Sequence, residues 1–325
     1  MKAATVVTLA GALAAGLAAP FAAAQTYPAK PVRMIVPLSP GGAVDVAGRL
    51  VARSLSERWG TQVVVENRPG AGGTVGTAVA AKAAPDGYTL LMGSSTLMSV
   101  NPHLYPKLTY DTVRDFTPVA LVASTPLLLV VHPSVPVRNL KQFVTFAKGQ
   151  PGALNYSSSG NGSTGHLAGE MFRRATGTNI VHVPHSGSAP ALVSLMSGET
   201  QMMFPAISAA LSQARSGRLR ALAVTSQRRV DAAPELPTVA EAGVAGFDVE
   251  IWSGVFMPAH VPRELVARVH GDLMDLLKQA ALRKAFVEQG ASVVTRDTPE
   301  QFASYVKTEW SKWGRAVKES GAQID

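Results

Sequence analysis

The sequence predicts an α/β fold in which two lobes are joined by a two-strand hinge. Short β-branched runs alternate with helix-length amphipathic segments, a pattern typical of mostly parallel sheets covered by helices. Two long apolar stretches, Val119–His132 and Ile251–Pro258, divide this alternation into blocks. The chain of 325 residues is also longer than one hydrophobic core usually holds. Together these observations indicate that the chain leaves a first lobe, builds a second, and returns.

The first block has the order strand, helix, strand, helix, strand. A buried strand is predicted over Val32–Leu38, and Asp45–Trp59 has the apolar spacing of a helix that Gly60 ends. The next elements are a strand at Gln62–Glu66, a helix at Gly73–Ala84 and a strand at Tyr88–Met92. This order predicts parallel strands joined by right-handed crossovers.

The second block repeats the alternation. Predicted helices cover Leu140–Lys148, Thr164–Ala175, Ala189–Met196 and Ala209–Ser216. Predicted strands cover Leu154–Ser157, Ile180–Val183, Gln201–Phe204 and Leu219–Thr225. From Pro262 to Ile324 we expect almost only helix. The expected boundaries are 25–124 for the first part of lobe 1, 125–252 for lobe 2, and 253–325 for the return into lobe 1.

Residues 1–24 have the pattern of a secretory signal peptide. Lys2 precedes a run of small and apolar residues, and Ala22-Ala23-Ala24 offers an A-x-A cleavage site. A membrane-spanning helix is the alternative, since about 20 apolar residues can cross a bilayer, but no basic flank follows the run. We therefore expect export and cleavage near Ala24.

The composition argues against several classes of protein. The sequence contains no Cys, which rules out a cysteine lipid anchor, disulfides, cysteine nucleophiles and cysteine metal sites. The formal net charge is +8, but Lys and Arg are scattered along the chain and aromatic residues make up only 6% of it. Nucleic-acid binding is therefore not expected. We do expect the positive net charge to attract anionic solutes weakly.

Two predicted strand-to-helix turns, one in each block, carry the candidate ligand-binding residues. They are Ser39–Asp45 and Ser157–His166, and both are rich in glycine and hydroxyl side chains. Each lies at a predicted helix N-terminus, where free N–H groups and the helix dipole favour an anion. Ligands of open parallel sheets bind beyond the carboxyl ends of the strands. A cleft between the lobes is therefore the predicted site, and neutral donors must hold an anion because neither loop contains Arg.

The second turn also allows three other interpretations. Gly160–Gly165 matches the G-x-G-x-x-G dinucleotide fingerprint, but the next strand ends without the acidic residue that binds a ribose. Ser163 and His166 could indicate a hydrolase, although the G-x-S-x-G elbow is missing. His182 and His185 could indicate a metal, but no carboxylate lies nearby to complete a ligand set. We therefore expect no cofactor, no metal and no catalytic residue.

Several motifs resemble those of one receptor family. The most specific is VVVENRPGAGG, from Val63 to Gly73. The others are Pro37–Asp45, Pro85–Leu91, Asn101-Pro102, Tyr110-Asp111, Asp115-Phe116, Ser163–His166, Val183-Pro184, Ala221–Ser226 and Pro237–Gly243. They are similar to motifs of the Bug (Bordetella uptake gene) or TctC family, the periplasmic solute receptors of tripartite tricarboxylate transporters. The resemblance covers the whole chain after the signal segment.

The resemblance implies a type II periplasmic binding-protein fold and a receptor that hands a small carboxylate to membrane permease subunits. Signalling, in which the closed receptor docks on a sensor protein, is the alternative. In the family two loops grip one carboxylate, which implies ligand-binding roles for Ser39, Pro40, Gly41, Gly42, Ser94, Ser95, Ser158, Ser159, Gly160, Gly162, Ser163, Thr164 and His166. Asp45 is expected to cap its helix and fix the first loop.

Two places depart from the family pattern and are expected to border the variable end of the ligand. His185 stands where the family usually has Tyr, and Pro205-Ala206 stand where Asp or Ala and then Asn are usual. Because Pro205 offers no N–H donor, we expect these residues to suit a ligand with a less polar tail.

Overall fold

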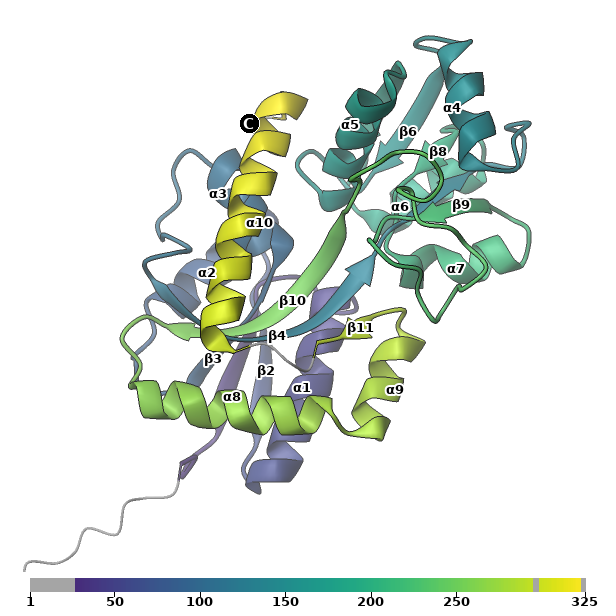
Figure 1. Cartoon of the computed structure of the whole chain (residues 1–325). Coiled ribbons are helices and arrows are strands. Elements are labelled where there is room, and N and C mark those ends of the chain that lie inside the picture. Colours follow the sequence, from purple (N-terminus) through teal and green to yellow (C-terminus); the bar gives the residue numbers. More distant parts are fainter. Residues whose placement is uncertain (1–26, 295–297, 323–325) are drawn as a thin grey trace, which may run out of the picture.

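The structure, a computed structural model, describes residues 27–294 and 298–322 and confirms an α/β architecture of two lobes (Figure 1). The predicted signal peptide, residues 1–24 with its cleavage site near Ala24, lies outside the described residues. Within the part of the chain that is described, no helix has both the length and the apolar character needed to cross a membrane.

Lobe 1 is built on a six-stranded sheet with the order β11-β4-β10-β3-β1-β2. Its strands are β1 (Val32–Val36), β2 (Val63–Asn67), β3 (Thr89–Ser94), β4 (Phe116–Pro126), β10 (Glu250–Pro258) and β11 (Ser292–Val293). Its helices are α1 (Ala43–Trp59), η1 (Ala71–Gly73), α2 (Thr74–Ala81), η2 (Thr96–Val100), α3 (Asn101–Leu104), α8 (Arg263–Leu277), α9 (Ala280–Glu288) and α10 (Pro299–Ser320). The sheet is mixed, because β1 is parallel to β2 and β3 whereas β10 is antiparallel to β3 and β4.

Lobe 2 is built on a five-stranded sheet with the order β7-β6-β8-β5-β9. Its strands are β5 (Leu128–Val131), β6 (Leu154–Ser158), β7 (Ile180–Pro184), β8 (Met202–Met203) and β9 (Arg220–Val224). Its helices are α4 (Leu140–Lys148), α5 (Thr164–Thr176), α6 (Ser188–Met196) and α7 (Ile207–Arg215). Here β6 is parallel to β7 and β8, and the central β5 is antiparallel to β8 and β9.

Helices cover both faces of each sheet, which explains why the strands are apolar at successive positions. In β1, Met34 and Val36 pack into a cluster with α1, α8 and α9, whereas Ile35 packs into a cluster with α10. In β5, Leu129 packs with α4 and α5, and Leu128 packs with α6 and α7. Successive side chains of a strand point to opposite faces, so both faces of each strand must be apolar.

Three elements connect the lobes. Strands β4 and β10 pair side by side along their lengths and cross from one lobe to the other (Figure 1). The third element is α10. Its Phe302 packs in a hydrophobic cluster of lobe 1, and its Trp313 packs in the main hydrophobic cluster of lobe 2. Near its end, Glu319 pairs with Arg174 of α5, with 3.5 Å between the charged atoms. The C-terminal helix therefore belongs to both cores.

Two segments differ from the sequence-based expectation. The stretch Pro262–Ile324, expected to be almost entirely helical, includes the short strand β11, which pairs with β4. No helix was expected directly after the strand Tyr88–Met92, yet β3 continues to Ser94 and the chain then enters helical turns that run through α3 to Leu104. Elements this short are stabilised by contacts with the rest of the protein, so they leave little periodicity in the sequence.

The first prediction concerns Gly254, which lies in the crossing strand β10. An added Cβ would overlap Phe302 Cζ and lie 3.0 Å from Ala120 O. We expect Gly254→Ala to lower the free energy of unfolding by about 1–3 kcal/mol, because it overpacks a filled core. Chemical denaturation measures this change.

Gly271→Ala is the matched control, because Gly271 lies inside α8 and no atom lies within 4 Å of its added Cβ. There the same substitution should raise the free energy of unfolding by about 0.5–1 kcal/mol, as expected for Gly to Ala in a helix. Effects of the same sign and size at both positions would contradict the packing explanation.

Candidate functional site

A cavity of about 490 Å³ lies between the lobes, beyond the carboxyl ends of β1, β6 and β8. It brings together these residues of the predicted site: Ser39, Pro40, Gly42, Ser158, Ser159, Gly162, Ser163, Thr164, Pro205 and Ala206. The first loop and the second loop, which are far apart in the sequence, thus face one space from opposite lobes.

Four helices begin at this cavity. Their N-cap residues are Gly42 of α1, Ser163 of α5, Gly187 of α6 and Ala206 of α7, and all four line it. Helices α1, α6 and α7 have no side-chain cap, so no side chain of the N-cap residue accepts a hydrogen bond from their first N–H groups. Each helix N-terminus carries roughly half a positive charge. Because no charged side chain lines the cavity within the described chain, its positive potential comes from the backbone.

The first loop is held in place by Asp45, which lies behind it. The Oδ2 atom of Asp45 accepts hydrogen bonds from Gly41 N at 2.9 Å and from Arg49 Nε at 3.0 Å. Its Oδ1 atom accepts one from Asn67 Nδ2 at 2.8 Å, and the same Nδ2 donates to Leu38 O at 3.0 Å. Both ends of the loop are therefore tied to one buried network.

Asp45 acts on the loop and not as the helix cap, since the N-cap of α1 is Gly42. Burial alone would raise the pKa of Asp45, but the hydrogen bonds from Arg49, Gly41 and Asn67 hold this pKa below its usual value. Asn67 is not among the predicted site residues. Its position at the end of β2, beside the end of β1, was the feature that could have indicated a role in holding the first loop.

The second loop is held from behind by two histidines. The Nδ1 atom of His166 accepts a hydrogen bond from Gly162 N at 3.0 Å. The Nε2 atom of His182 lies 2.6 Å from Ser158 Oγ, which also accepts a hydrogen bond from Gly160 N at 3.1 Å. The N–H groups of Gly160 and Gly162, both predicted to face the ligand, are thus used within the loop itself.

The hydrolase interpretation finds no support in the geometry of Ser163 and His166. Ser163 Oγ accepts a hydrogen bond from the backbone N of His166 at 3.3 Å and so caps α5. The imidazole of His166 bonds to Gly162, so the described residues show no hydrogen bond from ring to hydroxyl. Among the described residues, no group of His, Asp and Glu side chains is arranged to hold a metal ion either.

Other residues of the predicted site do not line this cavity. They are Gly41, Asp45, Ser94, Ser95, Gly160, His166 and His185. Ser94 and Ser95 are buried beneath the end of β3, and the next residue, Thr96, lines the cavity instead. Thr96 Oγ1 lies 3.2 Å from Thr164 Oγ1, which joins the two lobes across the cavity.

Part of the lining is absent from the predicted site. From lobe 1 these residues are Leu38, Gly72, Thr96, Asn101, Leu104 and Tyr105. From lobe 2 and the crossing strands they are Leu127, Asn161, Gly165, Gly187, Ser188, Met203, Phe204 and Ile251. Asn101 Nδ2 donates to Gly72 O at 3.0 Å and so fixes the wall between η1 and α3. The motifs Val63–Gly73 and Asn101-Pro102 were the sequence signals for this wall.

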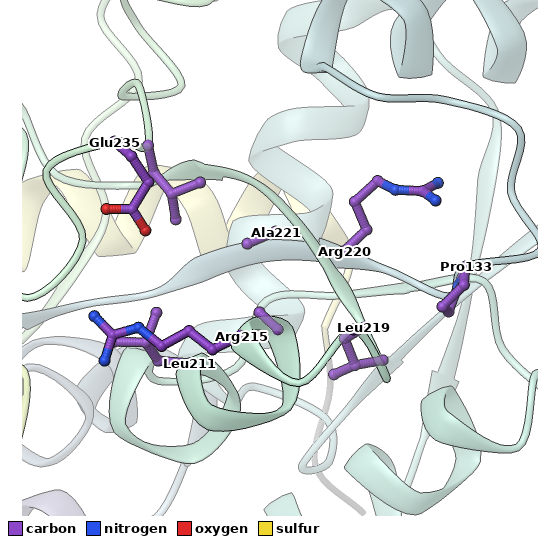
Figure 2. A pocket seen from close by; sticks show the side chains of 10 residues that line it. Pro133, Leu211, Arg215, Leu219, Arg220, Ala221 and Glu235 are labelled. Carbon is purple, nitrogen blue, oxygen red and sulfur yellow. The ribbon is translucent and has the colours of Figure 1, made fainter.

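A separate cavity of about 350 Å³ lies in lobe 2, at the amino end of β9 and the carboxyl end of α7 (Figure 2). Its two arginines are bound to carbonyl oxygens: Arg215 donates to Ala232 O at 2.6 Å, and Arg220 donates to Val137 O at 2.7 Å. A helix C-terminus carries negative partial charge. This cavity therefore suits an anion less well than the space between the lobes.

Comparison with known proteins places the chain among solute receptors. The family model described as tripartite tricarboxylate transporter family receptor (TctC) matches residues 47–322. Protein BugT of Bordetella pertussis is 39% identical over 311 residues, which cover 95% of each chain. The solved structure of R. palustris Rpa4515 with adipate is 34% identical, with a TM-score of 0.82 over 92% of this chain and 100% of that one. MatC from Rhodopseudomonas palustris with bound malate is 32% identical, with a TM-score of 0.77 over 90% of this chain and 100% of that one.

Proposed function

Because the chain belongs to the TctC family of tripartite tricarboxylate transporter receptors, we propose that it binds a small carboxylate between its lobes and delivers it to the permease subunits of such a transporter. Members of this family are periplasmic solute-binding receptors and not enzymes. The observation that carries the carboxylate proposal is the convergence of four helix N-termini on one cavity without charged side chains in the described chain. The adipate and malate of the similar structures are also carboxylates.

Neutral donors are sufficient for this task. A hydrogen bond from an N–H or O–H group to a carboxylate contributes roughly 1.5–3 kcal/mol. Several such bonds support a micromolar dissociation constant, which corresponds to about 8 kcal/mol. Since α1 belongs to lobe 1 and α5 to lobe 2, a ligand between them favours the closed arrangement by contacting both lobes at once.

The wall formed by lobe 2 and the crossing strands supports a ligand with a less polar body. It consists of Leu127, Met203, Phe204, Pro205 and Ile251. Apart from backbone groups this wall offers no hydrogen-bond donor, and Pro205 has no N–H. The carboxylate would therefore lie at the helix N-termini while the rest of the molecule contacts this apolar wall.

The carboxylate proposal predicts that charge decides binding. Hexanoate should raise the unfolding temperature of refolded, ligand-stripped protein, whereas hexanamide and hexanol should not. A ligand at a hundred times its dissociation constant adds about 2.7 kcal/mol to the free energy of unfolding, a shift of a few degrees. Thermal unfolding measures the shift, and equal shifts from the neutral analogues would rule out an anion site.

The apolar wall predicts that affinity increases with chain length. Along the series acetate, butanoate, hexanoate, each buried CH₂ group should contribute about 0.8 kcal/mol, roughly a fourfold gain in affinity. Isothermal titration calorimetry measures the dissociation constants. A flat series would mean that the body of the ligand does not contact the apolar wall.

The second loop should tolerate no side chain at Gly162. Its φ is +73°, and an added Cβ would overlap Leu104 Cδ1 from lobe 1. We expect Gly162→Ala to displace the loop and weaken carboxylate binding at least about tenfold, since each misplaced charged hydrogen bond costs roughly 1.5 kcal/mol or more. The matched control is Gly177→Ala at the other end of α5, where φ is +64° and no atom lies within 4 Å. If both variants bind hexanoate equally, this loop does not hold the ligand.

A further inference from the structure

Two histidine rings are stacked beneath the second loop and do not line the cavity. His166 comes from α5 and His182 from β7, and their ring centroids lie 3.9 Å apart with an angle of 11° between the planes. The ring of Tyr156 lies 4.9 Å from that of His182. His166 is only 5% exposed and His182 is half-buried, so the stack is largely shielded from water within lobe 2.

Each ring holds a different point of the loop. His166 Nδ1 accepts the hydrogen bond of Gly162 N, so this nitrogen must be unprotonated. His182 Nε2 bonds to Ser158 Oγ, which in turn accepts the hydrogen bond of Gly160 N. Two N–H groups are thereby fixed on the inner side of the loop, and Asn161 and Thr164 of the same loop line the cavity.

The surroundings of the stack keep both rings neutral. Burial lowers the pKa of His166, and the charge of Glu170 on the same helix opposes this effect. Burial, together with the neighbouring His166 and His185, lowers the pKa of His182 to about 3. Glu170 is itself engaged, because it accepts hydrogen bonds from Tyr156 Oη at 2.8 Å and from Arg173 Nε at 2.9 Å.

We propose that His166 and His182 are positioning residues that hold the second loop in its binding conformation only while both rings are neutral, so that acid releases the bound carboxylate. This inference rests on the proposed carboxylate site. A proton on His166 Nδ1 would replace an acceptor by a donor that faces the N–H of Gly162. Two cationic rings 3.9 Å apart would also repel each other.

The direction of the pH dependence follows from the lowered pKa values. Both histidines have a lower pKa in the folded protein than the usual 6.5. Affinity is therefore complete above about pH 6.5 and declines as the pH falls toward the folded-state pKa values. The free energy of unfolding declines in the same direction, because the unfolded chain takes up protons first. Binding must consequently be measured where circular dichroism shows the protein to be folded.

The test uses variants that keep the hydrogen bonds but cannot take up a proton. His166→Asn places Oδ1 near the position of Nδ1, and His182→Gln places a polar atom near the position of Nε2. Calorimetry with hexanoate at about pH 7.5 should show His166→Ala binding at least about tenfold more weakly than the native protein, and His166→Asn regaining most of that loss. His260→Asn, on an exposed loop of lobe 1, is the control for the same exchange elsewhere.

Lowering the pH from about 7.5 to about 4, as far as circular dichroism shows both proteins to be folded, should weaken hexanoate binding by the native protein at least about twofold more than binding by the His166→Asn/His182→Gln double variant. The comparison cancels the titration of hexanoate itself. Parallel pH profiles, or a folded His166→Ala protein with native affinity, would overturn the inference and leave the carboxylate site intact. Absence of hexanoate binding to the native protein at about pH 7.5 would instead overturn the carboxylate site and this inference with it.

Discussion

The structure depends on one geometric constraint: the carboxyl ends of β1, β6 and β8 face the same space between the lobes. A helix that follows a parallel strand begins at the carboxyl edge of the sheet, so its unpaired N–H groups point into that space. Helices α1, α5, α6 and α7 all begin there. The positive potential of the cavity is therefore a consequence of chain direction, and the described lining needs no Lys or Arg to provide it.

Donors of this kind are useful only if the loops that carry them are held in place before a ligand arrives. Buried side chains hold both loops, by different chemistry. In lobe 1 an ionised group, Asp45, collects three donors, whereas in lobe 2 the neutral rings of His166 and His182 accept or share single hydrogen bonds. One loop is consequently tied by a group that must be ionised, and the other by rings that must be neutral.

The sequence predicted much of this arrangement. Runs such as Val32–Leu38, the long crossing stretches and the glycine-rich turns gave the two lobes, the hinge strands and the two loops. It did not give the direction of individual side chains, because a shift of one residue moves a side chain to the other face. The chain also turns from strand into helix at Ser95, and Thr96, not Ser94 or Ser95, lines the cavity. His166 likewise has the right position in the loop, but its ring packs on His182, a contact that no local pattern encodes. The expected lobe boundaries at residues 124 and 252 stay predictions.

The C-terminal helix determines how the lobes can move. If β4 and β10 were the only connections, the lobes could rotate apart about these two strands as a hinge. Helix α10 opposes this rotation, because it inserts Trp313 into the core of lobe 2 and Phe302 into the core of lobe 1. A wide swing would expose both aromatic side chains to water and break the ion pair between Arg174 and Glu319. Helix α5 packs against α10, so a slide in which these packed helices shift without separating would preserve their contact. Such a slide would change little apolar contact, and the free-energy difference between the two arrangements would then be small. The hydrogen bonds and apolar contacts of a bound carboxylate would be enough to offset it.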